Sequence, residues 1–172
     1  MNGLRNRKGK EYDYKGNLMF EGEYLNGEKN GKGKEYRNSQ LEFEGEYLNG
    51  KKNGKGKEYR NGQLEFEGEY LYGSKLKGKE YIKGKLEYEG EYLYTNKWNE
   101  KGYDENGNII YELINGNGTI KEYNRKGELS FEGEYLNGLR NGKGKEYNYK
   151  GNLIFEGEYL NGKKMEWKSN RI

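Results

Sequence analysis

Pairs of glutamates separated by one residue are the first feature of the sequence that could do chemistry. They occur in the word EGE, for example at Glu44 and Glu46. Two carboxylates flanking one bond are the arrangement that glycoside hydrolysis uses. The pair returns in six copies of the word EGEY, however, on a face that lysines also supply. Because active sites are few per protein, this recurrence favours a solvated charged surface over a catalytic pair.

A second group has the spacing of a calcium loop. Asp104, Asn106 and Asn108 occupy the first three ligand positions, but the sixth position is Ile109 instead of Gly and the twelfth is Asn115 instead of Glu. A turn is therefore the favoured interpretation. The chain also has no Cys and no His, which removes thiolate ligands, the commonest metal ligand and the usual general base. We expect no enzyme activity, no cofactor and no metal site.

The composition indicates what kind of fold must position these side chains. Only 30% of the residues are hydrophobic and 35% are charged, yet there are 19 Tyr and 29 Gly and no Pro. So many aromatic residues argue against disorder, and the scattered helix formers argue against helices. The charge of +3 is spread in short mixed words, so no nucleic-acid partner is expected. No long apolar run or signal peptide is found, which predicts a soluble, cytoplasmic protein.

An internal repeat organises the whole sequence. The word EGEY ends at Tyr24, Tyr47, Tyr70, Tyr92, Tyr135 and Tyr159, and the word KEY ends at Tyr12, Tyr36, Tyr59, Tyr81, Tyr123 and Tyr147. Both words share a period of about 23 residues. The sequence predicts a single repeat array over residues 1–172 with about seven hairpin units, irregular at 93–120. A C-terminal cap is expected at 163–172, where Met165 and Trp167 break the pattern and cover the open sheet edge.

Length differences between the repeats locate the turns. The connector DYKGNLMF in the first repeat corresponds to RNSQLEF and RNGQLEF in the next two, and such deletions are tolerated in turns and not in strands. Turns are therefore expected at KGN, NGQ and NGxxNG, where Asn-Gly and Lys-Gly supply positive φ angles. Each repeat then contains two strands, which predicts an all-β fold of tandem β-hairpins.

The longer strand of each repeat alternates with a period of two. Phe43, Gly45 and Tyr47 point to one face, and Glu44 and Glu46 point to the other together with the leucine that follows. Since the shorter strand GKGKEY offers few large apolar groups, aromatic rings are expected to pack on bare glycine backbone. The predicted structural repeat core comprises Phe20, Gly22, Tyr24, Phe43, Gly45, Tyr47, Phe66, Gly68, Tyr70, Tyr88, Gly90, Tyr92, Phe131, Gly133, Tyr135, Phe155, Gly157 and Tyr159.

These words resemble the MORN repeats, whose pattern of roughly 23 residues contains YEGEW-x-NG-xxx-G-x-G. FEGEYLNGKKNGKG at 43–56 carries the resemblance, which recurs at 131–144 and 20–33, and EYRNGQLEFEGEY at 58–70 is similar to the variant MORN repeats of bacterial proteins. Tyr replaces the usual Trp, and 93–120 follows the pattern poorly. The resemblance implies an elongated, single-layer, twisted antiparallel sheet. It also implies scaffolding, homotypic assembly or membrane-associated attachment, and no chemistry.

The irregular stretch concentrates apolar groups and is the candidate partner-binding patch, with a diverged repeat packed on itself as the alternative. Its candidate residues are Trp98, Tyr103, Ile109, Ile110, Tyr111, Leu113 and Ile114. The expected function is a non-catalytic scaffold for an unidentified protein partner or for self-association. Two alternatives stay open: an adaptor making weak contacts with anionic lipid through lysine-rich turns, and an antitoxin-like or immunity-like binder.

Overall fold

The described part of the chain consists of strands and turns. The computed structural model describes residues 6–93, 96–104 and 106–165, and no helix occurs among them. Contacts within the chain divide it between Leu86 and Glu87 into two compact units. The expected all-β class, with consecutive hairpins in antiparallel sheet, is confirmed.

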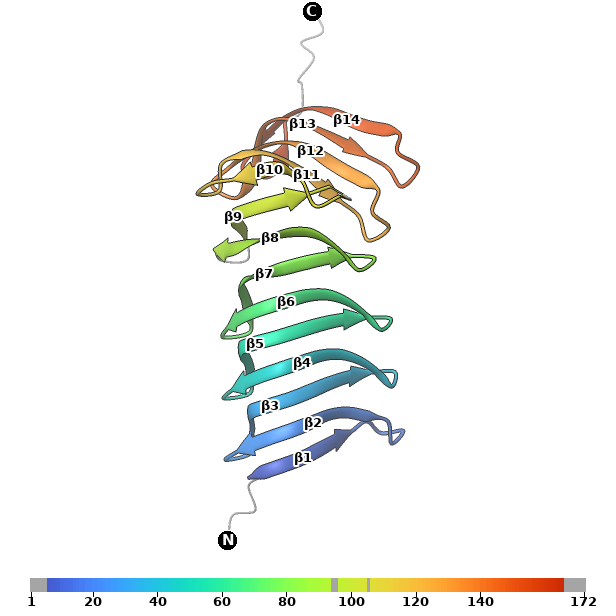
Figure 1. The fold of residues 1–172 in the computed structure, drawn as a ribbon, viewed down its shortest axis with the longest axis vertical. Coiled ribbons are helices and arrows are strands. Elements are labelled where there is room, and N and C mark those ends of the chain that lie inside the picture. The colour runs from blue at the N-terminus through green and yellow to red at the C-terminus, as the bar shows by residue number, and fades with distance from the viewer. Residues whose placement is uncertain (1–5, 94–95, 105, 166–172) are drawn as a thin grey trace, which may run out of the picture. The chain divides into compact units, whose positions relative to one another are not determined.

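Unit 1 is a sheet in which each strand pairs with the next one along the chain (Figure 1). Its strands are β1 (Arg7–Tyr12), β2 (Leu18–Leu25), β3 (Glu28–Arg37), β4 (Gln40–Leu48), β5 (Lys51–Arg60), β6 (Gln63–Leu71) and β7 (Ser74–Ile82). All six of these pairings are antiparallel. The sheet is therefore a run of hairpins without a crossover.

Glycines lie opposite one another across the whole of unit 1. One glycine from each strand pairs in register with the next, in the order Gly9, Gly22, Gly33, Gly45, Gly56, Gly68 and Gly78. The sheet thus has a row of bare backbone running perpendicular to its strands. This row leaves the space that large side chains from neighbouring positions can occupy.

The hairpin turns are shorter than the sequence predicted. At NGxxNG, only the first pair forms the turn: Asn49 (φ 48°) and Gly50 (φ 78°) are both left-handed, as a type I′ hairpin requires. The second pair belongs to β5, where Gly54 (φ 92°) forms a bulge and the next amide, Lys55 N–H, donates to Glu46 Oε2 at 3.0 Å. The carboxylate satisfies the amide that the bulge takes out of the ladder.

Unit 2 also consists of hairpins, but its ladder is interrupted. Its strands are β8 (Lys85–Leu93), which begins at the end of unit 1, β9 (Asn96–Tyr103), β10 (Ile109–Leu113), β11 (Gly118–Tyr123), β12 (Leu129–Leu136), β13 (Leu139–Tyr147), β14 (Leu153–Leu160) and β15 (Lys163–Lys164). Strands β11 to β15 form a separate five-stranded sheet, since no ladder joins β10 to β11. Tyr111, Leu113 and Ile120 form a small buried cluster at this break.

The end of the described chain is a short strand. Lys164 pairs with Tyr159, and Met165 N–H donates to Glu158 O at 2.8 Å. The rest of the expected cap, including Trp167, lies outside the described residues. The cap over 163–172 therefore stays a prediction.

Candidate interaction surface

One face of the sheet in unit 1 carries the phenylalanine rings and the tyrosine rings of the EGEY words, and these rings lie on the glycine row. A methyl group built on Gly56 would stand 2.6 Å from Phe43 Cε2 and 3.1 Å from Tyr70 Cε2. The ring of Phe43 also reaches the other side of the pair, because Gly45 would meet its Cζ at 2.6 Å. Each phenylalanine therefore covers a pair of facing glycines. This face is called the aromatic face below.

The rings contact one another edge to face along the sheet. Phe43 contacts Tyr47 of its own strand with centroids 5.6 Å apart and Tyr70 of the next hairpin at 5.4 Å. Phe20 makes the corresponding contacts, and so does Phe131 in unit 2. T-shaped pairs of this kind contribute about 0.5–1.5 kcal/mol beyond the area that they bury. The series of rings thus links each hairpin to the next.

The predicted core residues differ in how deeply they lie. The buried rings are Phe20, Tyr24, Phe43, Tyr47, Phe66, Tyr70, Phe131 and Tyr159. The half-buried rings are Tyr88, Tyr92, Tyr135 and Phe155. The predicted glycines Gly22, Gly45, Gly68 and Gly133 each face another glycine across the ladder, and Gly157 faces Gly144, whereas Gly90 faces Glu100. The glycine pairing is therefore replaced at the start of unit 2.

A basic side chain covers each phenylalanine from the solvent side. Lys52 Nζ lies 4.0 Å from the centroid of Phe43, and Arg140 Cζ lies 3.9 Å from that of Phe131. The sequence analysis did not predict this role, although the sequence contains a signal for it: a basic residue stands second after the turn in six repeats. Those over phenylalanines are Lys29, Lys52, Lys75, Arg140 and Lys164, and the sixth, Lys97, lies over Tyr88. A cation over a ring contributes about 0.5–2 kcal/mol, depending on its desolvation.

The same cations join glutamates of neighbouring hairpins. Lys75 Nζ lies 3.3 Å from Glu58 and 3.2 Å from Glu80, and Lys52 lies 3.5 Å from Glu58 and 3.9 Å from Glu35. The charges of the aromatic face therefore alternate along unit 1. These carboxylates are occupied in holding cations over rings, which is a structural role.

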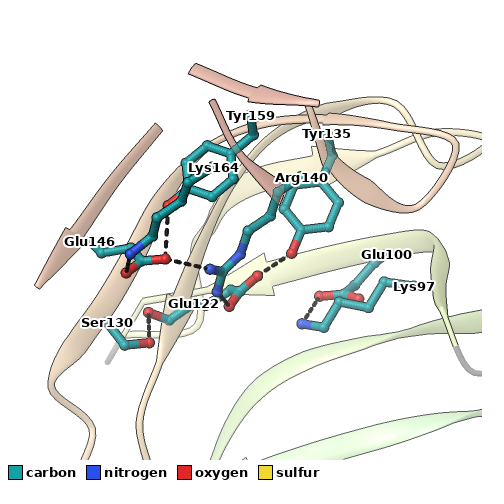
Figure 2. A network of polar contacts seen from close by, with 9 residues as sticks. All are labelled: Lys97, Glu100, Glu122, Ser130, Tyr135, Arg140, Glu146, Tyr159 and Lys164. Carbon is teal, nitrogen blue, oxygen red and sulfur yellow. Dashed lines mark hydrogen bonds and ion pairs between the residues drawn. The ribbon is translucent and has the colours of Figure 1, made fainter. Parts of the chain in front are cut away.

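In unit 2, an arginine makes the densest form of this arrangement, and Figure 2 shows it. Arg140 donates to Glu122 at 2.6 Å and to Glu146 at 3.0 Å, and Glu146 also binds Lys164 at 2.7 Å. The hydroxyl of Tyr159 donates to Glu146, and that of Tyr135 donates to Glu122. Burial acts to raise the pKa of Glu146, but these donors and cations outweigh it and hold the pKa below its usual range.

The opposite face, called the outer face below, carries tyrosine hydroxyls bonded to glutamates. Tyr59 donates to Glu44 at 2.7 Å, and Tyr36 donates to Glu21 at 2.8 Å. Partial burial and the hydrogen bond to the carboxylate raise the pKa of Tyr59 to about 12. Lys57 lies 3.5 Å from Glu67 on the neighbouring strand. The recurring glutamates of the EGE words therefore lie among lysines and tyrosines of the neighbouring strands.

One aliphatic side chain per repeat stays exposed next to the hairpin turn. It is the residue directly before the turn, and in the EGEY repeats it follows the buried-face tyrosine and so points to the outer face. The exposed fractions of these side chains range from 39% to 61%, and the residues are Leu25, Leu48, Leu71, Leu93, Ile114, Leu136 and Leu160. The three in unit 1, which we call the leucine row, end alternate strands β2, β4 and β6. Their spacing is about 10 Å, because neighbouring strands lie about 4.8 Å apart.

The candidate patch in the irregular stretch is divided by the structure. Tyr111 and Leu113 are 8% and 1% exposed and pack against Ile120, so they belong to the core of unit 2 and are not available to a partner. The hydroxyl of Tyr111 donates to the buried Glu100 at 2.9 Å. Trp98 and Tyr103 are half-buried, and the exposed members are Ile109, Ile110 and Ile114. Binding through those exposed residues stays a prediction.

The possible calcium loop is an ordinary turn. Asp104 Oδ1 accepts the N–H groups of Asn106 and Asn108, each at 2.8 Å, and Oδ2 accepts the side-chain amide of Asn108 at 2.9 Å. These bonds lower the pKa of Asp104 and tie its carboxylate to the turn. Within the described ranges, no group of three or more His, Cys, Asp or Glu side chains could hold a metal ion.

The comparisons with known proteins agree with this geometry. The family model described as "MORN repeat" matches residues 20–40, 43–64 and 131–153. None of the curated proteins compared with the chain is significantly similar to it. MORN repeats generally bind proteins or membranes and are generally not enzymatic. In the part of the chain that is described, no helix is long and apolar enough to span a membrane. Because the matched segments are the hairpins whose rings lie on paired glycines, the chain contains MORN repeats.

Proposed function

We propose that the chain is a non-catalytic scaffold that binds a protein partner through the outer face of its hairpins. One observation carries the proposal: each repeat leaves an aliphatic side chain exposed at the same position, although the chain contains few aliphatic residues. Exposed apolar groups gathered in a regular row favour a contact surface, because a lone exposed leucine would need no explanation.

The state of the carboxylates supports a binding role over a catalytic one. Glu44 and Glu67 accept hydrogen bonds from Tyr59 and Tyr81, both at 2.7 Å, and each also has a lysine partner across the ladder. A catalytic carboxylate pair needs one group kept protonated and another ionised. The tyrosine hydrogen bond instead lowers the pKa of Glu67, which favours its ionised form.

Charge on the outer face favours a protein over a lipid surface. Lys34 lies 3.7 Å from Glu44, and Lys10 lies 3.2 Å from Glu21, so the two signs alternate from strand to strand. A membrane-binding surface would instead gather cations without adjacent carboxylates. The lipid adaptor is therefore an outcome to test, as is an antitoxin-like binder, for which the hairpins offer no specific feature.

Two measurements on the purified full chain test the proposal. The first is photo-crosslinking from reporters placed on the outer face, with partners identified by mass spectrometry. We expect crosslinks to one protein, or to the chain itself, that are lost in a Leu48→Ser/Leu71→Ser variant. The second is co-sedimentation with anionic vesicles at low and high salt, where we expect no partition. Salt-sensitive binding to the vesicles without protein crosslinks would overturn the proposal.

A further inference from the structure

We infer that the chain carries a site of spontaneous covalent modification at Asn61, where the side-chain amide is converted to a carboxylate. Asn61 and Gly62 form the two-residue turn between β5 and β6, and both are exposed. An asparagine followed by glycine is prone to this reaction, because no side chain on the glycine shields its amide nitrogen. The inference goes beyond the proposed function, since Asn61 precedes β6 whereas Leu71 of the leucine row ends it.

The reaction uses only the turn itself and water. The backbone nitrogen of Gly62 loses its proton and forms a bond to Cγ of Asn61, ammonia leaves with the side-chain nitrogen and that proton, and a cyclic succinimide remains. Water then opens the ring at one of its two carbonyls. Opening at the side-chain carbonyl gives aspartate, whereas opening at the main-chain carbonyl gives isoaspartate, in which the main chain runs through the former side chain.

Asn49-Gly50 forms a nearly identical turn with which this site can be compared. The φ angles are 48° and 78° there, against 49° and 76° at Asn61-Gly62. All four residues are exposed, and beyond the chain neighbours no atom lies within 4 Å of a methyl carbon built on either glycine. The two turns differ in the bonding of the glycine amide. Gly50 N–H donates to Lys29 O of the preceding hairpin at 2.9 Å, whereas Gly62 N–H donates to no other described residue.

The bond to the preceding hairpin recurs at the same end of the sheet. Gly73 N–H donates to Lys52 O at 2.8 Å. The same bond joins neighbouring hairpins at three turns of unit 2, with distances of 2.7–2.9 Å at Gly116, Gly138 and Gly162. Such an amide must break its hydrogen bond before its nitrogen can reach the side chain, so these steps react more slowly. The residue that corresponds to Lys52 ahead of Gly27 lies outside the described part of the chain, so Asn26-Gly27 carries no expectation.

The products change the hairpin that the turn closes. Isoaspartate adds one carbon to the main chain of a two-residue turn, which then no longer matches the pairing of Arg60 with Gln63. Either product also places a carboxylate next to Arg60, whose Nε lies 2.7 Å from Glu65. The modification therefore loosens the β5–β6 hairpin at the end away from the leucine row.

Peptide mapping by mass spectrometry tests the inference on the full chain, aged in mildly alkaline buffer prepared with isotopically labelled water. In the folded chain, Asn61 should be converted about two- to tenfold faster than Asn49, which is the factor that one hydrogen bond of ordinary strength implies. In concentrated urea the two rates should be equal, because both asparagines precede glycine. Equal rates in the folded chain, or a faster reaction at Asn49, overturn the inference.

Two variants supply a matched pair at new positions. Tyr72→Asn creates an Asn-Gly step at a φ of 50°, ahead of Gly73, whose amide is bound to Lys52 O. Lys83→Asn creates one at a φ of 51°, ahead of Gly84, whose amide donates to no other described residue. The new step of Lys83→Asn should react at least about twofold faster than that of Tyr72→Asn, with circular dichroism checking that both variants are folded. Equal rates in the two folded variants would show that the amide bond does not control the reaction and would overturn the inference.

Discussion

Replacing Gly56 by Ala tests whether the rings need bare backbone beneath them. The added methyl carbon would lie 2.6 Å from both Cε2 and Cζ of Phe43, whereas carbon atoms in ordinary contact are about 3.5–4.0 Å apart. The ring would have to move by about 1 Å, but Lys52 holds it from above, and Tyr47 and Tyr70 lie at its edges.

Overpacking of this kind destabilises by about 1–3 kcal/mol, and the enclosed ring places Gly56→Ala in the upper half of that range. The substitution also restricts the unfolded chain, which returns about 0.5–1 kcal/mol. We therefore expect a net loss of about 2 kcal/mol in the free energy of unfolding, measured by urea denaturation. Hydrogen exchange of the amides in β4 to β6 should be measured as well, because a repeat array need not unfold in a single step.

A double-mutant cycle separates the ring clash from other causes. Phe43→Leu alone should destabilise by about 1–2 kcal/mol, since it loses less than a truncation to alanine. In the double variant the methyl group occupies space that the ring has left, so the loss of stability should be at least about 1 kcal/mol smaller than the sum of the two single losses. Gly62→Ala is the control, because Gly62 (φ +76°) has no atom within 4 Å of the added carbon. Its backbone strain should simply add to the effect of Phe43→Leu. An additive result for Gly56→Ala would refute the ring-on-glycine explanation.

Three further predictions concern the polar groups. Lys52→Met keeps the aliphatic stem over the Phe43 ring but removes the charge, so we expect the free energy of unfolding, measured by urea denaturation, to fall by about 1–2 kcal/mol. The control Lys55→Met, at an exposed position, should lower it by less than about 0.5 kcal/mol, and equal losses would contradict a role for the cation. In Arg140→Lys, one ammonium group replaces the two guanidinium nitrogens that bind Glu122 and Glu146. The hydrogen-exchange rates in β12 to β14 should therefore rise while those in β2 to β6 stay unchanged, and an unchanged rate in β13 would contradict this prediction. Partial burial and hydrogen bonding raise the pKa values of Tyr36 and Tyr59 to about 12, above an unfolded value near 10. The contribution of these two tyrosines to the free energy of unfolding is therefore complete below pH 10 and is lost as the pH rises through 12. Phenolate absorbance and thermal unfolding across that range check the last prediction, and titration of both tyrosines near pH 10 would contradict it.

Local sequence was sufficient to predict the hairpins because their signals are local. Asn-Gly and Lys-Gly steps favour left-handed turn residues, and Asn49, Asn61 and Lys83 do have φ values near 50°. The period of two then assigned Phe43 and Tyr47 to the same face, and both are buried. The fold class could thus be read from turns and alternation alone.

Other features depended on information that the letters do not carry. Asn53-Gly54 has the same two residues as the turn before it, yet it forms a bulge, because the strand register already fixes where the chain reverses. The interruption after Leu113 could be suspected from the irregular repeat, but the packing of Tyr111 and Leu113 against Ile120 depends on contacts between strands. Lysines over the rings were missed because exposed charge is the usual reading of Lys, although its position after the turn recurs.

The ring contacts between neighbouring hairpins determine how many residues such a chain can gain or lose without disturbing its packing. Phe43 contacts Tyr47 of its own strand and Tyr70 of the following hairpin. Excising or duplicating a block of about 23 residues within unit 1 would reproduce the same contacts across the new junction, whereas a block of any other size would misplace them. Genes encoding this architecture can therefore lengthen or shorten by recombination between their own repeats, and each product inherits a packing that already works.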